Sequence, residues 1–250
     1  MHTIRHVARK VLRQSFLQTK KLFFGSTVIA DDPYVRYLEY VCGGGMFEKG
    51  NLYAWEKAIQ ALPEGVSVVE IGAFSGVSTN ILTYLLEKYG KQNPFFSVDC
   101  WRLQDNEAPF FHKQFAFENY NRFVKESFIR NTKFFSGNRL PFAIEATSKD
   151  FFKMWRAGES ITDLFGRSVR LGGKIGFCFI DGDHSYAGAK QDFLDTHAFL
   201  PPGGLVLFDD SSDGSGWDQL NRLMGEVAAR SDYALFLKNP NYLFKRVGGE

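Results

Sequence analysis

The chain has little of what marks a membrane-spanning, disulfide-rich or nucleic-acid-binding protein. No run approaches the roughly 18 consecutive apolar residues that a membrane span requires. Its three cysteines, Cys42, Cys100 and Cys178, are an odd number without metal-type spacing. An excess of one charge is also missing, because 30 Lys and Arg stand against 28 Asp and Glu, so no nucleic-acid partner is indicated. We therefore expect a soluble, cytoplasmic protein with free thiols.

Acidic residues are missing from positions 1 to 30, where six Lys or Arg alternate with apolar residues at helical spacing. This pattern predicts a basic amphipathic helix in an N-terminal extension, residues 1–30, ahead of a single domain over residues 31–250. One interpretation is that residues 1–25 contact an anionic membrane surface or act as a targeting segment. The other is that the helix packs on the domain or on a second copy in a homo-oligomer.

Beyond residue 60, short apolar runs alternate with segments of helical spacing. The runs predict strands over residues 66–73, 94–100, 142–148, 175–183 and 203–211, and a C-terminal hairpin that turns at residues 239–241. Either Ser148 or Asp150 is expected to cap the helix after the third strand. Near-continuous apolar strands are typical of parallel sheets covered on both faces. We therefore predict a doubly wound, Rossmann-like α/β fold with a seven-stranded, mostly parallel sheet and an antiparallel C-terminal hairpin.

Polar residues stand where each of these strands ends. They are Glu70 with Gly72, Asp99, Ser148, Asp181 with His184, and Asp209 with Asp210. The carboxyl ends of parallel strands meet at one edge of the sheet, where ligands bind. Ala73 and Phe74 follow Gly72 in the first turn, so the full G-x-G-x-x-G pattern is absent, which argues against a nicotinamide or flavin cofactor.

Four ordered motifs together resemble those of one protein family. They are E-x-G-x-x-x-G followed by Ser-Thr, an acid closing the second strand, I-D-G-D-H-S-Y after the fourth, and P-G-G-x-x-x-x-D-D on the fifth. Over about residues 50–247 the chain looks like a class I S-adenosylmethionine-dependent methyltransferase. Within that class it is similar to the branch with the Asp-Gly-Asp-His signature, which includes sugar O-methyltransferases of macrolide biosynthesis.

The resemblance implies a set of cofactor-binding residues. They are Glu70, Gly72, Ala73, Phe74, Ser78, Asp99, Trp101, Ser148 and Asp181. In this set Glu70 and Gly72 would line the methionine end, and Trp101 and Ser148 would lie near the adenine. Asp99 would hold the ribose, because an acid at this place can accept hydrogen bonds from a ribose diol. A helix cap or a surface turn is the alternative role for Asp99.

A neutral alcohol attacks a sulfonium poorly, so methyl transfer to oxygen is helped by a base and by a divalent cation. Asp181, Asp209 and Asp210 carry hard oxygen ligands suited to Mg²⁺, and the resemblance places metal ligands at these positions. It also places the catalytic base at His184, with Asp181 beside it.

Several segments keep a second interpretation. A solvated loop with helix-capping acids is the alternative interpretation of residues 209–213, and Asp183 is expected to be a helix N-cap rather than a ligand. Residues 101–141 predict one or two aromatic-rich helices over the acceptor pocket, where the rings either stack on a substrate or form a hydrophobic cluster. Residues 41–59, with three consecutive glycines, are either a mobile entrance over the cofactor or a simple turn.

The sequence therefore predicts an S-adenosylmethionine-dependent, Mg²⁺-dependent O-methyltransferase that acts on a hydroxyl of a small natural product or a sugar, a glycoside included. Two alternatives remain open. One is a hydroxylase-like relative with the same signature. The other is a non-catalytic binding protein in which the basic N-terminal helix mediates membrane or partner binding.

Overall fold

The computed structural model describes residues 27–43, 46–102 and 117–248, so the predictions for residues 1–26 lie outside the described residues. Seven strands form one sheet, and in spatial order they are β3 (Phe142–Glu145), β2 (Phe95–Asp99), β1 (Ser67–Ile71), β6 (Ile175–Ile180), β7 (Leu205–Phe208), β9 (Tyr242–Arg246) and β8 (Tyr233–Lys238). Neighbours from β3 to β7 are parallel, whereas β9 is antiparallel to both of its neighbours, β7 and β8. The predicted mostly parallel sheet with a C-terminal hairpin is confirmed.

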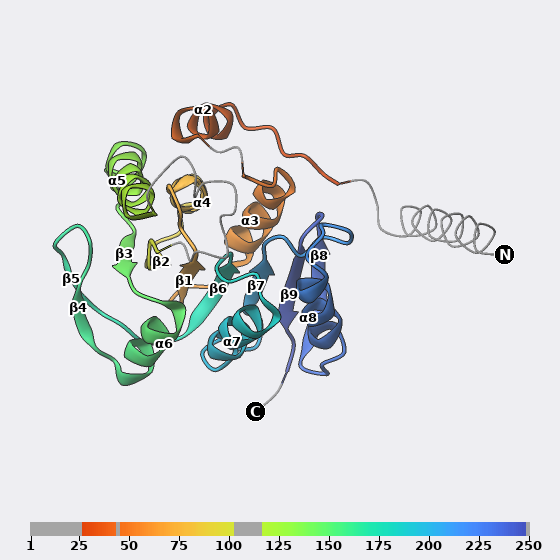
Figure 1. Ribbon diagram of the computed structural model, residues 1–250. Helices are drawn as coiled ribbons and strands as arrows, with labels where there is room; N and C mark the ends of the chain where they lie inside the picture. Colours follow the sequence, from red (N-terminus) through yellow and green to blue (C-terminus); the bar gives the residue numbers. More distant parts are fainter. Residues whose placement is uncertain (1–26, 44–45, 103–116, 249–250) are drawn as a thin grey trace.

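Helices cover both faces of this sheet (Figure 1). On one face lie α6 (Ser148–Ala157), α7 (Tyr186–His197) and α8 (Asp218–Ala228), and on the other lie α2 (Pro33–Cys42), α3 (Gly50–Ala61) and α4 (Val77–Lys88). The strands are apolar on both faces because successive side chains alternate: Val69 and Cys178 join the first core, whereas Val68 and Phe177 join the second.

The order of the strands reverses at β1. The chain runs outward from β1 through β2 to β3 and then returns to β6 on the other side of β1. The backbone N–H of Gly72 donates to Val98 of β2, whereas the N–H of Asp181 donates to Ile71 of β1, both at 2.8 Å. Ligands bind at such a switch point in open α/β sheets, so the fold places a site where β1 and β6 end.

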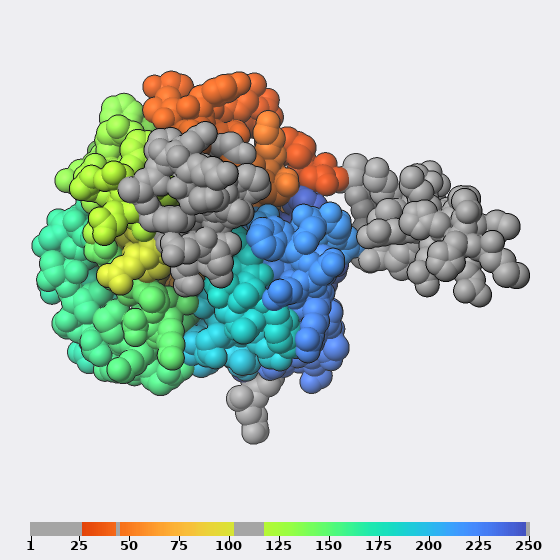
Figure 2. Space-filling model, in the orientation of Figure 1, coloured from red at the N-terminus to blue at the C-terminus, as the bar shows by residue number. Residues whose placement is uncertain are grey.

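One small sheet was not predicted. Strands β4 (Ser160–Thr162) and β5 (Ser168–Arg170) form a separate antiparallel pair, at the opposite end of the face in Figure 2 from the C-terminal elements. Each strand has three residues with mixed exposure. A strand this short does not show an alternating pattern, so the sequence carries no signal for it.

Two predicted helix caps were wrong. Thr147, not Ser148 or Asp150, caps α6, because Thr147 is the last extended residue and its hydroxyl accepts the N–H of Asp150 at 3.1 Å. Likewise Ser185, not Asp183, caps α7: its hydroxyl accepts the N–H of Gly188. Asp183 instead accepts the N–H of Ser185 at 2.7 Å and forms a turn just before the cap.

The predicted aromatic segment is described only in part, because residues 103–116 lie outside the described residues. Helix α5 (Phe117–Phe135) follows them and packs against α2 and α4. Phe128 is fully buried with Trp101 and Ala73 in a small cluster of its own, so the hydrophobic-cluster interpretation holds for this ring. In the described ranges all three cysteines are free. No helix there is long and apolar enough to cross a bilayer.

Candidate active site

The turn between β1 and α4 is held by one carboxylate. Oδ2 of Asp99 accepts hydrogen bonds from the N–H groups of Ala73 and Phe74, both at 2.9 Å, and Oδ1 accepts one from Trp101 at 2.6 Å. Burial raises the pKa of Asp99, and these three N–H groups act in the opposite direction. Oδ1 keeps room for one more donor. A ribose contact is therefore possible through Oδ1, and it stays a prediction.

Glu70 lies beneath this turn and is fully buried. Its Oε2 accepts hydrogen bonds from the hydroxyls of Thr79 at 2.5 Å and Ser97 at 2.6 Å, whereas its Oε1 has no hydrogen-bond partner in the described structure. Burial raises the pKa of Glu70 to about 7, although neighbouring hydroxyls, that of Ser78 first, lower it. Glu70 is not among the described residues that line the pocket below, so its contact with the methionine end of a cofactor stays a prediction.

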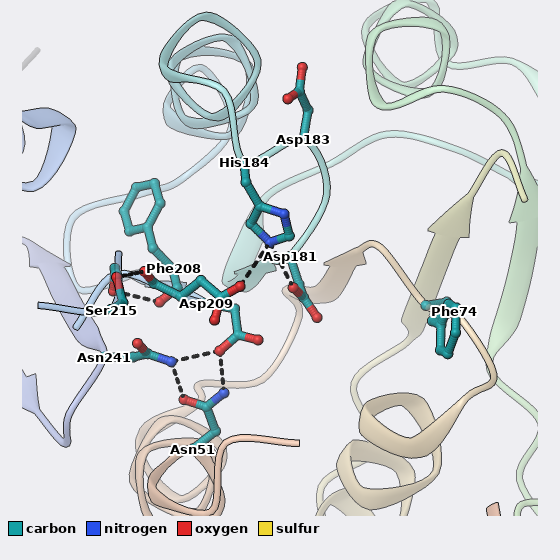
Figure 3. Close-up of polar contacts among 12 residues, drawn as sticks. Asn51, Phe74, Asp181, Asp183, His184, Phe208, Asp209, Ser215 and Asn241 are labelled. Carbon is teal, nitrogen blue, oxygen red and sulfur yellow. Dashed lines mark hydrogen bonds and ion pairs between the residues drawn. The ribbon is translucent and has the colours of Figure 1, made fainter. Parts of the chain in front are cut away.

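Two buried amides hold the side chain of Asp209 at the end of β7. The Nδ2 atoms of Asn51 and Asn241 donate to the same oxygen, Oδ1, at 2.7 and 2.6 Å, and Asn241 also donates to Oδ1 of Asn51 at 3.0 Å (Figure 3). Asn51 begins α3 and Asn241 lies in the turn between β8 and β9. Three distant segments thus meet at one carboxylate.

His184 stands between two other carboxylates. Its Nε2 is 3.5 Å from Oδ1 of Asp181 and 3.4 Å from Oδ2 of Asp210 (Figure 3). This nitrogen is buried and makes no hydrogen bond in the described structure. The indole of Trp217 stacks on the imidazole with ring centroids 4.9 Å apart and 27° between the planes. The predicted base therefore lies beside Asp181, as the sequence suggested.

Negative charge is concentrated around these residues. Loss of water and the neighbouring Asp210 raise the pKa of Asp181 well above its usual value, and burial with the charge of Asp181 does the same for Asp209. Within the described ranges, however, no set of three or more His, Cys, Asp or Glu side chains is arranged to hold a metal ion. Asp209 faces the two amides and Asp210 faces His184, so the predicted metal site is not shown.

A pocket opens where β1 and β6 end, and five predicted residues line it. They are Ala73, Phe74, Ser78, Asp181 and Asp209. In Figure 3, Phe74 lies across from Asp181 and His184. Gly72 is required beneath the pocket, since its φ is 90° and an added Cβ would lie 2.0 Å from the carbonyl oxygen of Asp181.

Two predicted adenine neighbours do not line this pocket in the described part of the chain. Trp101 is buried, and its Nε1 donates to the carbonyl of Phe74 at 2.9 Å. Ser148 begins α6, and its side chain bonds to the buried Asp192, whose pKa burial raises to about 6. Contact of Trp101 or Ser148 with a bound cofactor stays a prediction.

The sequence did not identify several residues of the site. From the segment before and within α3 come Phe47, Glu48, Asn51 and Trp55, which line the pocket. Residues 41–59 were expected to cover the cofactor or to form a turn, but no periodic signal singled out these side chains. Asn241 was interpreted only as part of a turn. Its amide reaches Asp209 through tertiary packing, for which a single sequence carries no direct signal.

Backbone strain gathers at this edge of the sheet. The non-glycine residues with positive φ in the described structure are Phe74 and Trp101, both at 45°, and Asp210 at 50°. Such conformations are costly, and they concentrate at functional sites. Here they position the two sides of the pocket, the turn held by Asp99 and the loop that carries Asp210.

Comparison with known proteins agrees with this fold. A sequence search of curated proteins finds no match. Among solved structures, the O-methyltransferase TomG from Streptomyces achromogenes, in complex with SAM, is 13% identical, with 92% of this chain and 96% of that chain covered and a TM-score of 0.53. SAH-bound PaMTH1 from Podospora anserina is 10% identical, with 96% of each chain covered and a TM-score of 0.57. The calicheamicin methyltransferase CalS11 is 13% identical, with 88% and 95% covered and a TM-score of 0.53.

These likenesses show the fold. The family model described as a methyltransferase domain matches residues 69–211, which is more than half of the chain. The matched region runs from β1, below the glycine turn, to the residues just after Asp209 and Asp210, and so includes the site described above. The chain belongs to this methyltransferase family and has the fold of the class I S-adenosylmethionine-dependent enzymes.

Proposed function

We propose that the protein transfers the methyl group of S-adenosylmethionine to a hydroxyl of a small acceptor, with His184 as the base. The observation that carries this proposal is the buried, unpartnered Nε2 of His184 between Asp181 and Asp210. A base that takes a proton from a hydroxyl becomes positively charged, and two carboxylates beside it stabilise that charge. An oxygen acceptor requires such a group, because a neutral alcohol is a weak nucleophile.

The pocket supports S-adenosylmethionine as the cofactor. It is lined by the turn that begins α4 and by Asp181 and Asp209, so a positively charged sulfonium would lie near carboxylates. The unpartnered Oε1 of Glu70 and the remaining acceptor position on Asp99 fit a ligand that carries amino and hydroxyl donors. TomG and PaMTH1 are solved with this cofactor or its demethylated form.

Mg²⁺ binding by Asp181, Asp209 and Asp210 is part of the proposal. Their donor chemistry fits, since they are hard carboxylate oxygens, and a bound cation would offset the burial and mutual repulsion that raise the pKa values of Asp181 and Asp209. Bound Mg²⁺ would orient an acceptor hydroxyl and lower its pKa. The proposed acceptor is a sugar or a small natural product, in line with the involvement of TomG in tomaymycin synthesis and with CalS11 as a calicheamicin methyltransferase.

Calorimetric titration with S-adenosylhomocysteine tests the cofactor, and transfer of a labelled methyl group to a panel of sugars and phenols tests the reaction, with Mg²⁺ and with a chelator. His184→Ala should bind the nucleoside normally and lose transfer. The matched control is His197→Ala, because His197 lies at the far end of α7 and contacts Tyr233 instead of the site. Absence of nucleoside binding would contradict the proposal and favour a binding protein that keeps only the fold.

A further inference from the structure

Trp217 covers one face of the proposed base. Its indole lies nearly parallel to the His184 imidazole, with centroids 4.9 Å apart, and it is 44% exposed. The other three tryptophans, Trp55, Trp101 and Trp155, are between 1% and 5% exposed and belong to hydrophobic cores. Core packing therefore does not explain the exposed indole of Trp217, whereas its contact with His184 does.

The backbone places Trp217 and Asp210 together. Ser215 joins them, since its hydroxyl donates to the carbonyl of Asp210 at 2.9 Å and accepts the N–H of Trp217 at 3.3 Å. Trp217 is also the residue at which α8 starts, and its carbonyl accepts the N–H groups of Leu220 and Asn221 at 3.0 and 3.1 Å. Leu220 is buried in the core. The indole is thus attached to a helix end that is anchored by packing.

His184 has no such anchor of its own. It lies in the loop between β6 and α7, its side chain is 31% exposed, and its contacts with Asp181 and Asp210 are 3.4 to 3.5 Å long. Those distances exceed a normal hydrogen bond, so they do not by themselves hold the ring in one rotamer. A stacked aromatic ring restricts rotation of the imidazole, because a turn about χ1 or χ2 would separate the two planes.

We propose that Trp217 is a positioning residue that holds the His184 imidazole with Nε2 between Asp181 and Asp210. This inference rests on the proposed function, in which that nitrogen takes the proton of the acceptor. Trp217 acts through His184 and contributes no reacting group of its own. Placement of a base within the reach of one hydrogen bond is worth large factors in rate, and a displacement of about 1 Å can cost roughly 100-fold.

The first test needs only the protein and no acceptor. The chain has five histidines, so ring-labelled histidine gives a small set of NMR signals, and His184→Gln identifies the one from His184. The indole ring current should move the His184 ring protons upfield in the wild type, and Trp217→Leu should abolish this displacement. Trp217→Phe should retain part of it. Identical His184 signals in the wild type and in Trp217→Leu, with both proteins folded, would overturn the proposal.

The second test is a double-mutant cycle on methyl transfer. Trp217→Leu should lower kcat by roughly 10-fold, which is part of the roughly 100- to 10,000-fold that a positioned base supplies. It should leave the KM for S-adenosylmethionine unchanged and be partly rescued by Trp217→Phe. In a His184→Ala background the same substitution should have no further effect, because the two residues act as one unit. Full activity of His184→Ala would refute the proposed function. Loss of activity in His184→Ala but not in Trp217→Leu would refute only the role of Trp217.

Discussion

The same edge of the sheet carries two groups of acids that the chain treats differently. The β1–β2 group consists of Glu70 and Asp99, and the β6–β7 group consists of Asp181, Asp209 and Asp210. In the first group, hydroxyls and backbone N–H groups bond to the carboxylates. In the second, two amides bond to one oxygen of Asp209, while Asp181 and Asp210 face His184.

This difference separates structural acids from acids that are available for chemistry. Asp99 holds a turn, and its removal would leave backbone donors unpaired. Burial and the charge of Asp210 raise the pKa of Asp181, and burial and the charge of Asp181 raise that of Asp209, so the fold brings carboxylates together where ionisation is unfavourable. Such clusters are unfavourable for stability and are typical of functional sites. We therefore expect substitutions in the β6–β7 group to lower activity without a loss of stability, and substitutions in the β1–β2 group to lower stability.

The largest effect is expected for Asp181→Asn. Methyl transfer should fall by roughly 1000-fold, within the range for general-base catalysis, because the carboxylate that supports the His184 cation is lost. Stability at pH 7 should stay equal or increase, since the raised pKa of Asp181 means that its ionised form is unfavourable in the fold. Transfer of a labelled methyl group and urea unfolding measure the two quantities.

The matched control for that variant is Asp183→Asn, two residues along the same loop. Asp183 is exposed, and the Oδ1 atom that accepts the N–H of Ser185 is retained in asparagine. The control should keep both activity and stability. A stability loss in Asp181→Asn without a loss of transfer would place Asp181 among the structural acids and remove the distinction between the two groups.

Asp99→Ala should show the opposite pattern in the β1–β2 group. Its carboxylate accepts three backbone N–H groups, of which those of Ala73 and Trp101 are partly buried and that of Phe74 is exposed. Unpaired buried donors cost about 1–3 kcal/mol each, so the free energy of unfolding should fall by roughly 4 kcal/mol. Urea unfolding measures this. Asp99→Asn keeps one acceptor oxygen and should lose less. If Asp99→Ala is as stable as the wild type, these hydrogen bonds do not hold the turn.

The residue pattern predicted that these acids lie at one edge of the sheet. The apolar runs that end at Glu70, Asp99, Asp181 and Asp209 placed the four acids at one edge, because the carboxyl ends of parallel strands share an edge. The sequence could not show which of these acids accept hydrogen bonds from other residues of the chain. Asn51 and Asn241 are 158 and 32 residues away from Asp209 along the chain, and only the packed fold brings them together.

The sequence also did not indicate that Trp217 contacts the site. The loop after β7 was interpreted as either metal-binding or solvated, and its aromatic residue was not singled out. The stacking on His184 depends on where α8 starts and on the positive φ of Asp210. Neither feature leaves a periodic pattern in one sequence, whereas the strands and the surface-facing helices do.

A smaller effect, visible only as a pH dependence, is expected for Glu70→Gln. Its pKa is raised to about 7 from 4.5, so the folded state holds the proton more tightly than the unfolded state does. The wild type should therefore lose unfolding free energy, on the order of 3 kcal/mol, as the pH rises from 4.5 to 7. The glutamine variant lacks this contribution. Urea unfolding of both proteins across this range isolates it, because Asp181 and Asp209 are the same in both.

A wild-type curve parallel to that of Glu70→Gln would mean that Glu70 has an ordinary pKa in the fold. The neighbouring hydroxyls would then fully offset the burial of the ionised carboxylate, and Glu70 would differ from Asp181 and Asp209, whose pKa values are raised. Added S-adenosylhomocysteine provides a second check, since a ligand that brings a donor to Oε1 should favour the ionised form and reduce the pH dependence.

The smallest effect is expected for Asn241→Ala, which tests the one place where the chain provides donors to the β6–β7 group. Asn241 is buried, and its amide is one of two that bond to Oδ1 of Asp209. Asn51 remains, so stability should fall by about 2 kcal/mol and not by the larger loss expected at Asp99. The control is Asn138→Ala in the exposed turn after α5, which should be neutral. Because Asp209 would lose a donor that favours its ionised form, transfer should weaken at low pH more than at high pH. An equal loss at every pH would mean that Asn241 supports the packing of the hairpin and not the charge of Asp209.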